Sequence, residues 1–172
     1  MRRRLSIFGT ILILNIFFQI SCVSVPHMIL PQKDIQPGEL NEPGLDKKIL
    51  VASRYSDFKQ TIVEKIKTAF QDESVYIKFI GLGQIEEENA DQYNAVVMIN
   101  TCMSWDMDRN VHGFLKRYKD HSNMIILTTS GDGNWLPKMK GRNFDAISSA
   151  SKKANADEVA NEIITKINSR LE

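Results

Sequence analysis

Short apolar runs alternate with stretches of helical periodicity along most of this 172-residue chain. Continuous apolar runs are typical of strands that are buried on both faces of a parallel sheet. Two of the runs lead into small polar loops that each carry a tryptophan. The pattern predicts five strands, at 48–53, 76–80, 95–100, 123–129 and 144–148.

Apolar residues at helical spacing lie between the predicted strands. We expect Ser56 or Asp57 to cap a first helix, while Asn155, with Glu158 three residues later, predicts a capping box at the last helix. The acidic stretch 84–92 has room for at most two helical turns, with a solvated face. The apolar faces of the three helices are predicted at Phe58, Ile62, Ile66 and Phe70, at Val111, Phe114, Leu115 and Tyr118, and at Val159, Ile163, Ile167 and Leu171.

Alternating strands and helices joined by right-handed crossovers predict an α/β domain of three layers. A five-stranded domain of this size favours the strand order 2-1-3-4-5, which is the flavodoxin-like arrangement. We therefore predict a three-layer flavodoxin-like sandwich with a five-stranded parallel sheet over residues 48–172. Its switch point lies between the first and third strands, where open α/β sheets bind ligands at their carboxyl edge.

The N-terminus has the features of an export signal. Three arginines precede the apolar stretch 5–18, which is shorter than the roughly 20 apolar residues of a membrane-spanning helix. The sequence Gln-Ile-Ser-Cys at 19–22 resembles the lipobox of bacterial lipoproteins. The resemblance implies cleavage before Cys22, whose thiol would carry a lipid with fatty acyl chains such as palmitate. The alternatives are an ordinary signal peptide and an uncleaved anchor.

A proline-rich stretch follows Cys22. Four of the five prolines lie between residues 23 and 47, and no helical or strand period is sustained there. A flexible chain of this length spans roughly 25–30 Å, so we expect a spacer. The predicted organisation is a lipoprotein signal peptide at 1–21, a lipid-anchored tether at 22–47 and a flavodoxin-like domain at 48–172. The protein would sit in a bacterial cell envelope, outside the cytoplasm, bound to the membrane through its N-terminal lipid.

Composition excludes some kinds of site. Removal of the three N-terminal arginines leaves 19 basic and 21 acidic residues, with no basic stripe for nucleic acid. The histidines His27, His112 and His121 match no metal-ligand spacing, so we expect no metal. Cys102 is expected to be a small, partly buried side chain, the alternative being a redox thiol.

The loops that converge on the predicted switch point are 53–59, 100–109 and 130–135, and the segment 93–115 reads as strand, polar loop and helix. In these features the chain resembles the flavodoxin family over residues 48–171. The resemblance implies FMN as cofactor, with its phosphate at the first loop and its ring between aromatic side chains of the other two. It would place at the cofactor Ser53 and Ser56 from the first loop, Thr101 and Trp105 from the second, and Thr129, Ser130, Gly131, Gly133 and Trp135 from the third.

A second flavin signal lies at 145–151. This stretch resembles the Asp-x-x-Ser/Thr-Gly-Ala-Thr segment of membrane-associated proteins that carry FMN covalently on threonine. Ser151 would then be the modified residue. The alternative is a polar turn between a strand and a helix.

The first loop also departs from the flavodoxin pattern. It contains no glycine, and it places Tyr55 and Asp57 where a phosphate would lie. Two functions therefore stay open, and with them the question of whether the chain is an enzyme. One is an anchored FMN protein that transfers electrons to a redox partner. The other is a non-catalytic flavodoxin-like domain that has lost its cofactor and binds an envelope protein.

Overall fold

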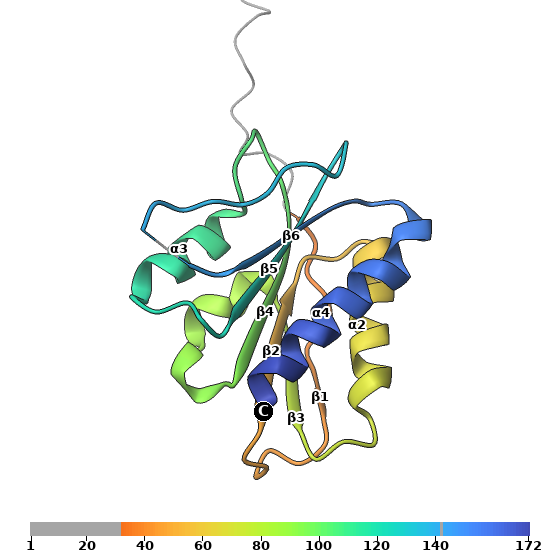
Figure 1. Cartoon of the computed structure of the whole chain (residues 1–172), viewed down its shortest axis with the longest axis vertical. Coiled ribbons are helices and arrows are strands. Elements are labelled where there is room, and N and C mark those ends of the chain that lie inside the picture. The colour runs from red at the N-terminus through yellow and green to blue at the C-terminus, as the bar shows by residue number, and fades with distance from the viewer. Residues whose placement is uncertain (1–31, 142) are drawn as a thin grey trace, which may run out of the picture. The chain divides into compact units, whose positions relative to one another are not determined.

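Six strands form one mixed sheet in the computed structural model, which describes residues 32–141 and 143–172. The strand order is β1-β3-β2-β4-β5-β6, as Figure 1 shows. Neighbouring strands are parallel throughout, except that β1 runs antiparallel to β3. The strands are β1 Gly38–Leu40, β2 Lys48–Ser53, β3 Tyr76–Gly81, β4 Ala95–Thr101, β5 Met124–Ser130 and β6 Asp145–Ala150.

The predicted sheet was right in its parallel part and wrong at one edge. The five expected strands follow one another as β3-β2-β4-β5-β6, which is the flavodoxin-like order. The prediction of a purely parallel, five-stranded sheet fails because β1 adds an antiparallel strand beside β3. This strand has only three residues and directly follows Pro37, so no alternating pattern could mark it.

Helices cover both faces of the sheet and make three layers (Figure 1). Helices α2 (Asp57–Phe70) and α4 (Ala156–Leu171) pack on one face. Helix α3 (Arg109–Arg117) and two 3-10 helices (Leu82–Glu87 and Ala90–Gln92) pack on the other. A third 3-10 helix, Lys153–Asn155, leads into α4. Strand β2 shows why its apolar run is continuous, because Ile49 and Val51 enter one core cluster and Leu50 and Ala52 enter the other.

Of the two predicted helix caps, the one at α2 is confirmed and the one at α4 is wrong. Ser56 caps α2, and its Oγ accepts a hydrogen bond from the backbone N–H of Lys59 at 3.3 Å. Asn155 precedes α4, but its side chain does not cap the helix. Its amide instead donates to the carbonyl of Ala150 at 3.3 Å, so the predicted capping box is wrong. The acidic stretch is also not entirely solvated, because Glu88 pairs with Lys78 at 2.7 Å.

The proline-rich stretch belongs to the domain from Gln32 onward, which corrects the predicted spacer. Ile35 is 4% exposed and lies in the core beneath α2. Asn41, at a φ of 63°, donates its side-chain amide to three carbonyls around the α2–β3 turn, those of Phe70, Glu73 and Val75. These contacts fix residues 32–47 against the sheet.

The predicted signal peptide at 1–21, the lipidation site Cys22 and the start of the tether lie outside the described residues. Within the part of the chain that the structure describes, no helix combines the length and the apolar character needed to cross a bilayer.

Candidate functional site

The carboxyl ends of the parallel strands meet at one edge of the sheet, at the top of Figure 1. A hollow of about 340 Å³ lies there between the ends of β4, β5 and β6. Four of the predicted cofactor residues line it, namely Thr101, Thr129, Ser130 and Gly131. The other five predicted residues do not, and the reasons differ from loop to loop.

The first loop is dominated by an ion-pair network around Arg54. Its Nε lies 2.8 Å from Oδ2 of Asp108, and its Nη1 lies 2.8 Å from Oδ1 of Asp34. A further hydrogen bond from Nη2 to Asp108 Oδ1, at 3.1 Å, makes the Asp108 contact bidentate. Burial by itself would lower the pKa of Arg54, but its bonds to Asp108 and the charge of Asp34 raise that pKa above its ordinary value. All three guanidinium nitrogens are therefore bonded to the two carboxylates.

The segment that precedes β1 covers this loop. The carbonyl of Lys33 accepts from the N–H of Tyr55 at 2.7 Å, and the N–H of Ile35 donates to the carbonyl of Ser53 at 3.3 Å. Asp34 also accepts from the N–H of Gly83 at 3.0 Å. A Cβ added at Gly81 would lie 2.6 Å from the Cβ of Asp34, so glycine is needed for this close approach.

Ser53 and Ser56 serve the fold of the first loop. Ser53 is fully buried, and its hydroxyl donates to the carbonyl of Arg54 at 2.7 Å. The Oγ of Ser56 accepts the hydrogen bond that caps α2. The N–H of Arg54 donates to the carbonyl of Ile99 at 3.0 Å. The groups expected to hold a phosphate are therefore bonded within the protein.

A buried amine lies beneath the second loop. Lys59 is 3% exposed, and its Nζ donates to the Oγ1 of Thr101. Burial lowers the pKa of Lys59 to about 8, an effect that the charge of Asp108 partly opposes and that of Arg54 reinforces. Thr101 therefore has a structural partner as well as a place on the hollow.

The second loop holds Trp105 away from the rest of the protein. Met103 and Asp106 exchange two backbone hydrogen bonds, of 2.9 and 3.1 Å, around a tight turn. Ser104 and Trp105 both have positive φ, 55° and 63°, as in a type I′ turn, which is unusual for a bulky side chain. Trp105 is 81% exposed.

Cys102 does not have the surroundings of an activated thiol. Its side chain is partly buried, as expected, and its backbone N–H donates to the carbonyl of Thr129 at 2.8 Å. Burial raises the pKa of the Cys102 thiol, although bonds from the backbone of Trp105 and Asp106 partly oppose the shift. Helix α3 begins only at Arg109, so its N-terminus does not lie at this cysteine.

The third loop is closed by its own side chains. The hydroxyl of Ser130 donates to Asp132 at 3.0 Å and accepts from the N–H of Gly133 at 3.0 Å. Gly133 has a φ of 78°, and a Cβ there would lie 2.4 Å from the backbone nitrogen of Ala150. Trp135 is partly buried against the core cluster beneath α3, in surroundings unlike those of the exposed Trp105.

Three residues of this edge were not predicted as site residues. Asp34 and Asp108 flank Arg54 from distant parts of the sequence, and Asn100 joins Asp108 to the core. The fully buried amide of Asn100 donates to Leu127 O at 3.0 Å, and its oxygen accepts from the N–H of Asp108 at 3.2 Å. The available signal was an asparagine directly after an apolar run, because a buried amide requires polar partners.

These residues do not fit an FMN phosphate. All three guanidinium nitrogens of Arg54 are bonded to carboxylates, and the hydroxyl of Ser53 donates within the first loop. Its backbone donors at Arg54 and Tyr55 are used, and an exposed carboxylate, Asp57, opens α2. Ser151, the residue proposed for covalent flavin, lies exposed on the rim of the hollow.

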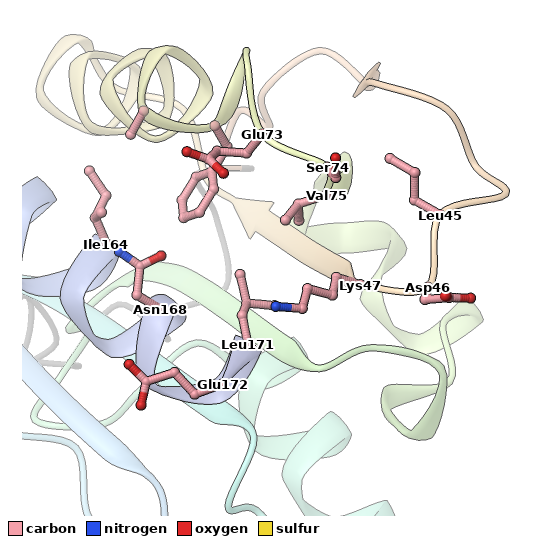
Figure 2. A pocket seen from close by; sticks show the side chains of 12 residues that line it. Leu45, Asp46, Lys47, Glu73, Ser74, Val75, Ile164, Asn168, Leu171 and Glu172 are labelled. Carbon is pink, nitrogen blue, oxygen red and sulfur yellow. The ribbon is translucent and has the colours of Figure 1, made fainter.

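A larger hollow, of about 690 Å³, lies at the opposite, amino edge of the sheet. Figure 2 shows it between the loop before β2, the turn after α2 and the end of α4. Phe70, Val75 and Leu171 give it an apolar floor, and charged residues such as Asp46 and Glu73 stand on its rim. The flavodoxin resemblance assigns nothing to this edge.

Comparison with solved structures finds low similarity to proteins of the same architecture. The chain is similar to a flavodoxin from the domain Archaea, at 8% identity and a TM-score of 0.48 over 73% of this chain and 99% of that one. It is also similar to a mutant flavodoxin from Pseudomonas aeruginosa, at 11% identity and a TM-score of 0.44 over 70% and 99% of the two chains. An oxidoreductase from Corynebacterium diphtheriae matches at 10% identity and 0.44 over 73% and 95%.

No family model and no curated protein matches the chain. The flavodoxin-like fold assignment rests on the strand order described above.

Proposed function

We propose that this protein is a lipoprotein of the bacterial envelope whose flavodoxin-like domain binds a partner protein without flavin and without catalysis. The observation that supports this most strongly is the first loop, in which Asp34 and Asp108 occupy the guanidinium of Arg54 and Lys33 occupies the N–H of Tyr55. In this proposal the flavodoxin-like architecture serves as a scaffold, since fold does not determine function.

The decisive test of the first part is a titration of the full mature chain in detergent with FMN. We expect neither tryptophan nor flavin fluorescence to change up to about 100 µM, a concentration that corresponds to about −5.5 kcal/mol of binding. Saturable quenching of both signals would overturn the proposal and restore an FMN protein for electron transfer to a redox partner. An intact mass of native protein without an added flavin would exclude covalent attachment at Ser151.

Membrane anchoring through Cys22 is supported by the lipobox-like sequence at 19–22. We expect the wild-type protein to sediment with membranes and the Cys22→Ala variant to appear in the soluble extracytoplasmic fraction. Full membrane retention of that variant would show that the N-terminal apolar segment alone holds the chain.

We assign the partner to the hollow at the amino edge, because an apolar floor with a charged rim is the usual anatomy of a protein interface. A photocrosslinking amino acid at Asn168, which is exposed and lines the hollow, should capture a discrete protein in native membranes. Asn161 on the same helix is also exposed but does not line the hollow, so it provides the matched control. Equal crosslinking from both positions would contradict the assignment.

A further inference from the structure

We propose that the carboxyl edge of the sheet lies against the headgroup layer of the membrane, with Trp105 as its interfacial anchor. This inference rests on the membrane anchoring proposed above, and it assigns to that edge a contact that the flavodoxin resemblance does not suggest.

The distribution of exposed apolar side chains supports it first. Among the residues that the structure describes, three large hydrophobic side chains are exposed, Tyr55 at 38%, Trp105 at 81% and Leu136 at 46%. They follow β2, β4 and β5, respectively, so all three belong to loops that leave the carboxyl ends of parallel strands. The amino-edge hollow, by contrast, keeps its large apolar residues such as Phe70 buried.

The conformation of Trp105 supports it second. The backbone bonds between Met103 and Asp106 hold the ring at the tip of a tight turn, at a φ that an L-residue seldom adopts. An indole combines an apolar body with an N–H donor, which suits it to the boundary between acyl chains and headgroups. A tryptophan held in this way is placed to contact a surface outside the domain and contributes little to the packing of the domain itself.

The point at which the chain enters the domain supports it third. Gln32, the first described residue, donates its side-chain amide to the Sδ of Met103, and Lys33 accepts from the N–H of Tyr55 at 2.7 Å. Both contacts are made to loops of the carboxyl edge. Gln32 is only ten positions after Cys22, so a lipid on Cys22 would keep this edge within about 35 Å of the membrane even if the chain were fully extended.

Basic side chains lie close in space or in sequence to two of the three exposed apolar side chains, Tyr55 and Leu136. The Nζ of Lys33 stands 4.3 Å from the centroid of the Tyr55 ring, and the exposed Lys138 and Lys140 follow Leu136 closely in sequence. The carboxylate of Asp106, beside Trp105, accepts from the N–H of Met107 at 2.8 Å. Lysines beside apolar side chains favour the anionic headgroups of a bilayer surface.

The test uses the full lipidated protein in vesicles of phosphatidylethanolamine and phosphatidylglycerol. In Trp135→Phe, Trp105 is the single remaining tryptophan, and lipids brominated near the headgroup should quench at least half of its fluorescence and shift its emission to the blue. In Trp105→Phe, the signal of the partly buried Trp135 should change much less. If Trp135→Phe does not fold, as judged by circular dichroism, the difference between wild type and Trp105→Phe isolates the same signal.

Flotation of the vesicles separates the outcomes. Protein that floats and shows quenched Trp105 supports the inference. Protein that floats with Trp105 unquenched overturns it but leaves the anchoring intact, and protein that does not float overturns the anchoring and this inference together. A blue shift of the Trp105 emission in native membranes but not in vesicles that contain no other protein would also overturn the inference. Trp105 would then contact a protein at this edge.

Discussion

The two edges of the sheet differ in how they hold polar and apolar groups. At the carboxyl edge, the charged side chains of Lys59 and Asp108 are buried, whereas the ring of Trp105 is exposed. At the amino edge the usual arrangement holds, since Phe70 and Leu171 are buried beneath an exposed rim of charge.

This difference between the two edges indicates that the carboxyl edge contains features that lower the stability of the domain. Buried charges and bulky residues at positive φ lower the stability of a folded domain, and such features tend to cluster at functional sites. The carboxyl edge should therefore respond strongly to substitution, in both directions, while comparable changes near the amino edge or on open surface should have small effects.

Loss of the Arg54 network should cost the most. Arg54→Met leaves Asp108, whose side chain is 6% exposed, as a buried carboxylate without its cation, so we expect the free energy of unfolding to fall by about 3–5 kcal/mol. Arg170→Met is the matched control, because Arg170 pairs with the more exposed Asp145 near the amino edge. That change should cost about 1 kcal/mol or less. Equal losses in urea unfolding would remove the contrast between the edges.

Removal of the Lys59 amine should stabilise the protein. The pKa of Lys59 is lowered by burial from 10.5 to about 8, so below pH 8 the folded state bears the full cost of a buried charge, about 3 kcal/mol. Between pH 8 and 10.5 the folded state gives up this proton before the unfolded state does, and the stability of the wild type should rise relative to Lys59→Met. Above pH 10.5 the cost is absent.

Urea unfolding at pH 7 and pH 10.5 measures the effect of Lys59→Met. We expect the variant to be more stable at pH 7 and the advantage to shrink toward pH 10.5. Lys65→Met on the same helix is the control, because Lys65 is 42% exposed and its loss should change stability little at either pH. A pH-independent difference would mean that Lys59 is not buried as a charge.

Gly133 and Gly131 form a matched pair within the third loop. In Gly133→Ala the new methyl group meets the backbone of Ala150 at 2.4 Å, at a φ of 78°, so a loss of about 2 kcal/mol is expected. Gly131→Ala meets nothing within 4 Å and should stay within about 0.5 kcal/mol of wild type. Thermal and urea unfolding of the two variants would reveal whether the loop is held as tightly as this geometry requires.

The smallest expected effect is a gain. Trp105→Gly relieves a bulky residue at a φ of 63° and should raise stability by about 0.5–1 kcal/mol, since glycine adopts this conformation readily. Trp105→Phe retains the backbone strain and should leave stability unchanged. A loss of stability in Trp105→Gly would mean that the indole packs on the domain, and the exposed ring would then need another explanation.

The sequence could predict the parallel sheet because each strand carries its own signal. In β2 the neighbours Ile49 and Leu50 point to different core clusters, so an uninterrupted apolar run follows directly from burial on both faces. The cap of α2 at Ser56 was predictable for the same reason, because it depends on residues within one turn. Local physics was sufficient for these elements.

The remaining features depend on contacts between distant parts of the chain. Arg54 meets Asp34 and Asp108 across 20 and 54 residues, and no spacing in the sequence announces either pair. Strand β1 is fixed by pairing with β3 and not by any pattern of its own. Asn155 stands at the right position for a cap, but the carbonyl of Ala150 competes for its amide. Four of the predicted cofactor residues line one hollow, whereas Ser53 and Ser56 are used inside the first loop.

The strip of backbone from Lys33 to Ile35 also determines how the domain would bear mechanical load. It is fastened to Tyr55, Arg54 and Ser53 by a short ladder of hydrogen bonds and an ion pair, which lies ahead of β1 in the chain. A pull on the chain before Gln32 would therefore reach these bonds first and release them one after another. At low force the segment 33–35 would detach from the loop after β2 and lengthen the free chain, while the parallel strands stay folded.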